Sequence, residues 1–213
     1  MTGGETTEHD PQRLVIAIDG PAGAGKSTLS RALARRLGIP RLDTGAMYRA
    51  VAWAALSRGI DPADREAVAD LARGLSISVS ARVIAEGTDI TEAIRAPDVN
   101  RAVSVVAANP EVRAVMVARQ RQWAEEHGGG VVEGRDIGSV VFPEADLKIY
   151  LTASGEERAR RRSEEGADWV ARRDHLDSSR AASPLGIAEG AKVIDTTGRP
   201  ITAVVEEVLG WLR

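Results

Sequence analysis

The chain of 213 residues is long enough for one domain with insertions and a sizeable core. It carries 28 lysine and arginine residues against 31 aspartate and glutamate residues, a net charge of −3, which argues against a general nucleic-acid-binding protein. There is no cysteine, so disulfides and thiolate metal sites are excluded, and we expect a reducing, cytoplasmic location. No apolar run reaches the roughly 18 residues that a membrane helix needs, so we expect no membrane partner.

The first elements in chain order are a polar tail, a strand and a helix. Residues 1–12 lack the apolar stretch of a signal peptide, and we expect a disordered tail. Residues 13–19 (RLVIAID) form a β-branched run that predicts a buried parallel strand. From Lys26 onward the apolar residues recur at helical spacing, and Gly38 and Pro40 end that helix.

Four more short strands are predicted, within residues 40–45, 131–134, 147–153 and 192–197. Helical stretches separate them, and this alternation predicts an α/β fold with a five-stranded parallel sheet flanked by helices. Residues 75–90 interrupt the pattern, because they alternate like an antiparallel hairpin and indicate a small inserted subdomain.

Two charged or polar stretches complete the chain. Residues 109–113 (NPEVR) predict a helix start, with Asn109 as N-cap, Pro110 in the first turn and Glu111 near the positive helix end. Residues 157–180 are dense in charge and helical in composition, and we expect a mobile flap there.

A glycine-rich loop lies between the first strand and the first helix. Its sequence, GPAGAGKST, matches G-x-x-x-x-G-K-[ST] in the strand–loop–helix context that this phosphate-binding motif requires. Backbone amides can wrap around a phosphate, Lys26 can reach the β- and γ-phosphates, and Ser27 can ligate Mg²⁺. We therefore expect a P-loop NTPase core whose ATP-binding loop comprises Gly20, Pro21, Ala22, Gly23, Ala24, Gly25, Lys26, Ser27 and Thr28.

The stretch LDTGAMYR follows the second predicted strand. Thr44 and Gly45 can start a helix whose free amides face an anion, and Tyr48 and Arg49 fall one turn later. An arginine near a helix start is poorly placed for the helix dipole, so an anionic partner is expected for it. The alternative, a surface Arg49 and a plain core Tyr48, stays open.

The stretch VVEGRDIGSVV, residues 131–141, places charges at the end of the third strand. Ligands bind at the carboxyl ends of parallel strands, so these charges should face the glycine loop. Glu133 is placed to hold a Mg²⁺-bound water, and Arg135 can grip a phosphate with its planar fork. A structural ion pair between Arg135 and Asp136 is the alternative.

These motifs, together with RRDHLDSSRAASPL near residues 172–185, resemble in matching order the bacterial cytidylate kinases of the nucleoside monophosphate kinase family. The resemblance implies transfer of the ATP γ-phosphoryl group to CMP or dCMP by a monomeric enzyme with Mg²⁺. It also implies a single kinase domain at 13–213: a core of 13–65, 125–156 and 181–213, an NMP-binding insert of about 66–124 and an arginine-rich lid of about 157–180.

The resemblance further implies which residues bind the acceptor nucleotide. The phosphate is gripped by Arg49, Arg135 and Arg180. The sugar is held by Asp177, with Arg173 and Tyr48 nearby, and Thr44 belongs to the same CMP site. The base is read by Ser104, Arg113 and Asp136.

This base-reading set suits cytosine rather than uracil. The Asp136 carboxylate can accept from the exocyclic amine, while Arg113 and Ser104 can donate to the ring nitrogen and carbonyl. Uracil would place a carbonyl against Asp136, and polar sites of this kind discriminate by up to about 10⁴–10⁵. We therefore expect preference for CMP over UMP.

Helical spacing puts Arg158, Arg161 and Arg162 on one face of the flap. A lid of arginines that closes over ATP would stabilise the charge of the migrating phosphoryl group and exclude water. We expect Arg158 and Arg162 to contact ATP, and the catalytic set to be Lys26, Arg135, Arg162 and Arg180. A merely solvated charged face is the alternative, and His9, His127 and His175 are read as non-catalytic.

Two other functions compete with this interpretation. One is a different small-molecule kinase, acting on UMP and CMP broadly, on AMP or on shikimate. The other is a nucleotide-regulated binding protein that uses the glycine loop as a switch. A second phosphate site made by Arg49, Arg135 and Arg180 argues against the switch, which needs none.

Overall fold

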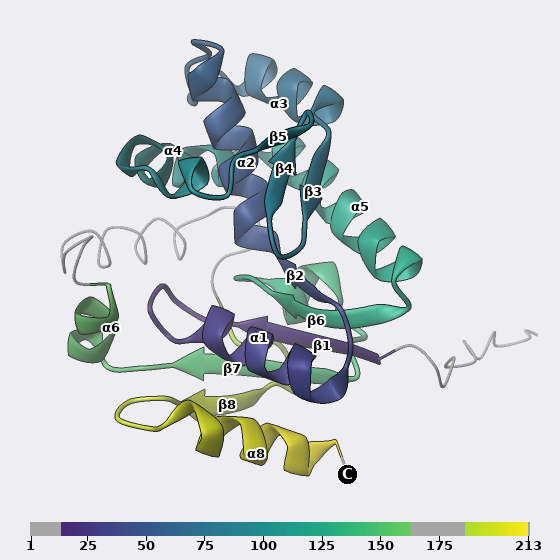
Figure 1. The fold of residues 1–213 in the computed structure, drawn as a ribbon, viewed down its shortest axis with the longest axis vertical. Helices are drawn as coiled ribbons and strands as arrows, with labels where there is room; N and C mark the ends of the chain where they lie inside the picture. The colour runs from purple at the N-terminus through teal and green to yellow at the C-terminus, as the bar shows by residue number, and fades with distance from the viewer. Residues whose placement is uncertain (1–13, 163–185, 213) are drawn as a thin grey trace, which may run out of the picture.

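The computed structural model describes residues 14–162 and 186–212 and contains the predicted five-stranded parallel sheet (Figure 1). Its strand order is β2-β6-β1-β7-β8, and every neighbouring pair is parallel. The strands are β1 (Leu14–Asp19), β2 (Arg41–Asp43), β6 (Gly129–Glu133), β7 (Leu147–Thr152) and β8 (Lys192–Asp195).

Helices pack on both faces of this sheet at its central strand, which explains why β1 is a continuous, largely buried apolar run. Alternate residues of β1 enter two different clusters: Ala17 packs with one set of helices, while Ile16 and Ile18 pack with the other. The helices are α1 (Lys26–Leu37), α2 (Thr44–Ser57), α3 (Arg65–Gly74), α4 (Pro97–Ala108), α5 (Pro110–Glu126), α6 (Gly155–Arg161) and α8 (Ile201–Trp211). Two short turns of helix, η1 (Ala93–Arg95) and the π-helical η2 (Ile137–Val141), complete the list.

The inserted stretch forms a small antiparallel sheet that lies above the parallel sheet in Figure 1. The predicted hairpin is present as β3 (Ile77–Val79) and β4 (Val83–Ala85), and a third strand, β5 (Thr88–Asp89), extends it. The tight return from β4 to β5 uses Glu86 at φ 48° and Gly87 at φ 78°, the conformation of a two-residue hairpin turn.

The predicted helix start at Asn109 is also present. The side chain of Asn109 is 4% exposed; its Oδ1 accepts from Glu111 N at 3.1 Å, and its Nδ2 donates to Arg65 O at 2.8 Å. One residue therefore caps α5 and ties it to the start of α3. Among the described residues, no helix combines the length and apolar character needed to cross a membrane.

Asn109→Ala should lower the free energy of unfolding by about 1–3 kcal/mol, because two hydrogen bonds of a buried side chain are lost. Asp64→Ala is the matched control: Asp64 is an exposed cap of α3 that accepts only from Ala67 N at 3.1 Å. Its loss should be about 1 kcal/mol or less. Urea unfolding of both variants measures the difference, and equal losses would contradict the double role of Asn109.

Candidate active site

The loop between β1 and α1 requires glycine at its first position. Gly20 has φ 143°, and a Cβ at this position would lie 2.2 Å from the carbonyl oxygen of Leu151 on β7. Gly25, with φ 97°, stands at the N-cap position of α1 with no side chain over the helix amides. The loop thus leaves the N-terminus of α1 open toward an anion, as its sequence predicts.

Lys26 and Arg135 converge on one carbonyl oxygen of this loop. Lys26 Nζ donates to Gly20 O at 2.7 Å and to Pro21 O at 2.8 Å, and Arg135 Nη1 donates to Gly20 O at 3.1 Å. Two cations that share an acceptor repel each other, and the repulsion is relieved when an anion joins them. The loop and the end of β6 therefore make a single positively charged point.

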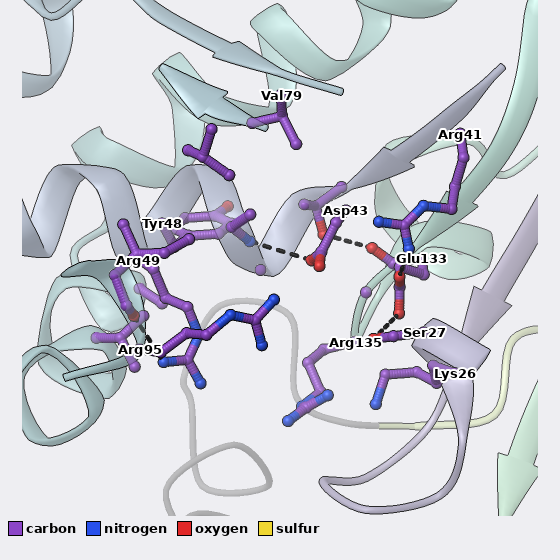
Figure 2. Close-up of a pocket in the computed structure, with 18 of the residues that line it drawn as sticks. Lys26, Ser27, Arg41, Asp43, Tyr48, Arg49, Val79, Arg95, Glu133 and Arg135 are labelled. Atoms are coloured by element: carbon purple, nitrogen blue, oxygen red, sulfur yellow. Dashed lines mark hydrogen bonds and ion pairs between the residues drawn. The ribbon is translucent and has the colours of Figure 1, made fainter. Parts of the chain in front are cut away.

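A cavity of about 240 Å³ opens beside this point, between the loop, α2 and the inserted sheet (Figure 2). We call it the central cavity. Ten of the residues singled out from the sequence line it: Lys26, Ser27, Thr44, Tyr48, Arg49, Arg113, Glu133, Arg135, Asp136 and Arg162. Four charged residues that sequence reasoning missed also line it: Arg31, Arg41, Asp43 and Arg95.

Other predicted residues lie beside the central cavity or outside the described residues. Ser104 is 6% exposed on α4, and its neighbour Val103, rather than Ser104 itself, lines the cavity. Arg158 lies against the glycine loop, where Nη1 donates to Ala22 O at 3.4 Å. The predicted contacts of Arg173, Asp177 and Arg180, with His9 and His175, fall outside the described residues.

The carboxylate of Glu133 is 2% exposed and joins three segments (Figure 2). Oε2 accepts from Ser27 Oγ at 2.8 Å, while Oε1 accepts from Ser30 Oγ at 2.9 Å and from Arg41 Nη1 at 3.0 Å. Burial raises the pKa of Glu133, and repulsion from Asp43 raises it further, while Ser27, Arg41 and Lys26 act in the opposite direction. Ser30 was not singled out from the sequence. It stands one helical turn after Ser27, so helical spacing could have placed its hydroxyl beside that of Ser27.

The helix α2 begins at Thr44 as predicted, but its first turn is not left open. Asp43 is the N-cap, and its Oδ1 accepts from Ala46 N at 3.1 Å. Thr44 Oγ1 donates instead to Glu133 O at 2.7 Å, which ties the start of α2 to the end of β6. The amide of Ala46 is therefore taken by a carboxylate of its own chain, and an anion facing the amides of Thr44 and Gly45 stays a prediction.

Arg49 and Tyr48 leave α2 toward the central cavity. Arg49 Nη1 donates to Ile94 O at 3.1 Å and also hydrogen-bonds Asn100 Oδ1, so η1 and α4 hold the guanidinium at the cavity wall. Tyr48 is 9% exposed and belongs to the core as well as to the lining. Arg49 is half-buried, which excludes the alternative that it is a plain surface charge.

Arg113 of α5 and Asp136, which follows β6, form a buried ion pair. Their exposed fractions are 5% and 6%. The alternative partner considered for Asp136 was Arg135, but the ion pair that the structure gives Asp136 reaches across to α5. An ion pair at the wall of a cavity presents an acceptor and a donor side by side, which is the pattern that an amide-like edge of a base requires.

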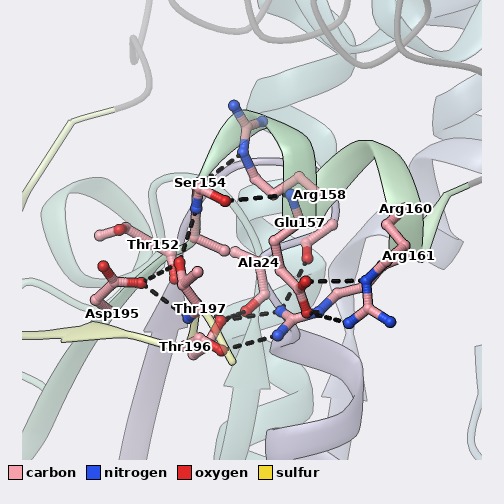
Figure 3. A network of polar contacts seen from close by, with 12 residues as sticks. Ala24, Thr152, Ser154, Glu157, Arg158, Arg160, Arg161, Asp195, Thr196 and Thr197 are labelled. Carbon is pink, nitrogen blue, oxygen red and sulfur yellow. Dashed lines mark hydrogen bonds and ion pairs between the residues drawn. The ribbon is translucent and has the colours of Figure 1, made fainter. Parts of the chain in front are cut away.

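The arginines of α6 point to different places rather than acting as one face (Figure 3). Arg161 Nη1 donates to Thr196 Oγ1 at 2.9 Å, Nη2 donates to Thr196 O at 2.8 Å, and Nε donates to Glu157 Oε1 at 2.8 Å. Thr196 Oγ1 in turn contacts Ala24 O at 3.0 Å. Arg161 therefore fastens α6 to the glycine loop and to the end of β8, while Arg162 lines the central cavity.

Asp19 ends β1 immediately before the glycine loop, and it is 3% exposed. Burial raises its pKa to about 6; hydrogen bonds from Gly138 N and Ile137 N, and the charge of Lys26, oppose this rise, and the charge of Asp136 adds to it. Asp19 is therefore an acid whose ionised form is disfavoured by its surroundings.

The contribution of Asp19 to stability should fall as the pH rises. Its pKa in the folded protein lies above its ordinary value of 3.8, so the folded state binds more protons than the unfolded chain between about pH 4 and about pH 6. A shift of roughly two units corresponds to about 3 kcal/mol, lost progressively across this window. Urea unfolding between pH 4 and pH 7 should show the wild type losing stability relative to Asp19→Asn. A difference that does not change with pH would contradict this assignment.

The family model and two curated proteins that match this chain carry the same description. The family model described as "Cytidylate kinase" matches residues 16–213. The "Cytidylate kinase" of Desulfitobacterium hafniense (strain Y51) is 51% identical over 215 residues, covering 93% of this chain and 92% of that protein. The protein of the same name from Rhodococcus opacus (strain B4) is 49% identical over 213 residues, covering 92% of this chain and 93% of that protein.

A solved structure supports the fold at a greater distance. A gluconokinase from Sinorhizobium meliloti 1021 aligns with a TM-score of 0.51 over 94% of this chain and 92% of that chain. The two sequences are 15% identical, so this likeness concerns the fold alone.

Proposed function

The chain belongs to the cytidylate kinase family, and from this premise we propose roles for residues of the central cavity. The enzyme transfers the γ-phosphoryl group of ATP to CMP or dCMP, giving ADP and CDP or dCDP. The observation that carries the rest is the convergence of Lys26, from the donor loop, and Arg135, from the cavity wall, on Gly20 O. Donor and acceptor phosphates would meet at this point.

On the donor side, the loop of residues 20–28 would bind the phosphates of ATP through its amides. The two acceptors of Lys26 Nζ are backbone carbonyl oxygens, which are neutral and form weaker hydrogen bonds than charged oxygens. Phosphate oxygens carry charge and form stronger bonds with an ammonium group. Lys26 would therefore exchange these carbonyls for the β- and γ-phosphates when ATP binds.

Mg²⁺ is the cofactor that we propose for this reaction, and the donor atoms fit it. The Ser27 hydroxyl would ligate the ion, because Mg²⁺ prefers oxygen ligands, and the buried Glu133 carboxylate, 2.8 Å from this hydroxyl, would hold one of its waters. Within 14–162 and 186–212 no group of three or more His, Cys, Asp or Glu residues could hold a metal ion. This fits an ion that takes one or two protein ligands and completes its shell with water and substrate phosphates. When bound, the ion neutralises charge that develops on the phosphates.

On the acceptor side, Arg49 and Arg135, which both line the central cavity, would grip the phosphate of CMP. They come from α2 and from the end of β6, and each guanidinium is held by backbone carbonyl oxygens. Groups held in place before the substrate arrives lose less entropy when they bind it. Arg180 is proposed as the third member of this clamp, and Asp177 and Arg173 as the contacts of the sugar.

The base would lie against Arg113 and Asp136. Asp136 would accept from the amine of cytosine, and Arg113 would donate to its carbonyl, with Ser104 supporting from α4. The ion pair between Arg113 and Asp136 supports this role, because it orients both groups without help from a ligand. Arg158 and Arg162 would contribute to the lid over ATP, and we propose a monomeric, cytoplasmic enzyme.

The substrate preference tests the base-reading pair. Comparison of kcat/KM should favour CMP over UMP by at least about 100-fold, because uracil would face Asp136 with a carbonyl oxygen. Asp136→Asn should shrink this ratio, since an amide can donate to that carbonyl. ADP formation must depend on the added monophosphate, which a nucleotide-switched binding protein would not require. Equal values for CMP and UMP in the wild type would refute the assignment.

The acceptor clamp predicts a loss confined to CMP. Arg135→Ala should raise the KM for CMP by roughly 10- to 100-fold, the effect of removing a charged hydrogen-bonding partner. Arg121→Ala is the matched control, because Arg121 donates to Val141 O and Val140 O at 2.9 Å each, at the far end of η2. Steady-state kinetics should leave its KM for CMP within about twofold of the wild type. Similar KM values for all three proteins would remove Arg135 from the clamp.

A further inference from the structure

The side chain of Asp19 spans from β1 to the turn that follows β6. Its Oδ1 accepts from Ile137 N at 2.8 Å, and its Oδ2 accepts from Gly138 N at 2.8 Å. These are the first two residues of η2, and they follow directly on Arg135 and Asp136. Both carboxylate oxygens are therefore used on consecutive amides of the segment that carries two residues of the central cavity.

The rest of this turn is fastened to the same end of β1. Gly134 N donates to Ile18 O at 2.9 Å, and Arg135 Nη1 donates to Gly20 O at 3.1 Å. Residues 134–138 thus lie along residues 18–20, with Asp19 holding the last two positions. Asp19 itself does not line the central cavity.

The geometry calls for a carboxylate at this position. Two consecutive amides that point at one side chain need an acceptor on each of its two terminal atoms, and an ionised carboxylate supplies both. Asparagine supplies one oxygen and turns an NH₂ group toward the other amide. Burial, and to a smaller extent repulsion from Asp136, disfavour the ionised form at this position and raise the pKa of Asp19.

We propose that Asp19 is a positioning residue for phosphoryl transfer, which sets the direction of Arg135 and Asp136 by holding the amides of Ile137 and Gly138. This inference rests on the proposed function, since Arg135 and Asp136 are the acceptor-site residues through which Asp19 would act. Because Asp19 does not line the central cavity, we expect it to act on CMP only through these two residues. Its loss should therefore weaken the use of CMP while leaving the donor loop able to bind ATP.

Asp19→Asn tests this assignment through the two KM values. The KM for CMP should rise about tenfold, the effect of losing one well-formed hydrogen bond at the turn, while the KM for ATP should stay within about twofold. Measurements are made well below the unfolding midpoint of each protein, so that folded enzyme is compared with folded enzyme. Asp19→Ser, whose shorter side chain brings no acceptor to the position of either carboxylate oxygen, is the second variant if Asp19→Asn does not fold, and it should show the same selective rise.

Asp146→Asn is the matched control. Asp146 Oδ2 accepts from Val15 N at 2.7 Å, so it also fastens β1 by a carboxylate–amide bond, but at the opposite end of the strand. Both KM values of this variant should match the wild type within about twofold. A purely structural Asp19 would behave in the same way as Asp146: a lower unfolding midpoint with both KM values unchanged would overturn the proposal.

A double-mutant cycle separates this proposal from the clamp on which it rests. In the Arg135→Ala background, Asp19→Asn should raise the KM for CMP by clearly less than in the wild type, because part of its effect passes through Arg135. Full additivity would overturn the positioning role. If Arg135→Ala raises the KM for CMP but Asp19→Asn does not, only the proposal for Asp19 fails. If Arg135→Ala has no effect, the clamp itself fails.

Discussion

The arrangement of this site depends on the hydrogen bonds that the buried carboxylate of Glu133 accepts. Its side chain binds the hydroxyls of Ser27 and Ser30 on α1 and the guanidinium of Arg41 on β2. Its carbonyl oxygen accepts from Thr44 at the start of α2. One residue at the end of β6 therefore joins the helix that follows the donor loop to the helix that carries Arg49. Removing such a group from water is costly unless every oxygen has a partner, and here each one does.

Pairing of buried acids with nearby donors also explains how a chain with a net charge of −3 forms a cavity lined mainly by basic residues. Two acids that line the cavity form ion pairs with arginines of the same lining. Asp136 pairs with Arg113, and Glu133 pairs with Arg41. Asp19 binds backbone amides instead of a cation. Each acid orients a neighbouring group, so the anionic ligand meets donors whose directions are already set.

Sequence reasoning succeeded where the signal is local. The glycine loop, the five parallel strands and the cap at Asn109 follow from short stretches whose residue types suit one conformation, and the structure contains all of them. It missed Arg41, Asp43 and Thr196, because their roles depend on which strands are neighbours and in what register. Strand β5 was missed because two residues are too few for an alternating pattern. Arg161 binds Thr196, while Arg162, which follows α6, lines the central cavity. This difference depends on what packs against the end of the helix, which helical spacing does not contain.

The helix α2 has a mechanical consequence for the acceptor side. Its first turn is pinned by Asp43 and Thr44, while Ala46 and Ala50 pack against Val83 of the inserted sheet. Close-packed interiors have low compressibility and transmit strain. Arg49 belongs to the same helix, so the inserted sheet and the guanidinium that we propose for the acceptor phosphate are joined through one packed element. A displacement of the insert would therefore change the position of this guanidinium relative to Glu133 O, which holds the start of α2.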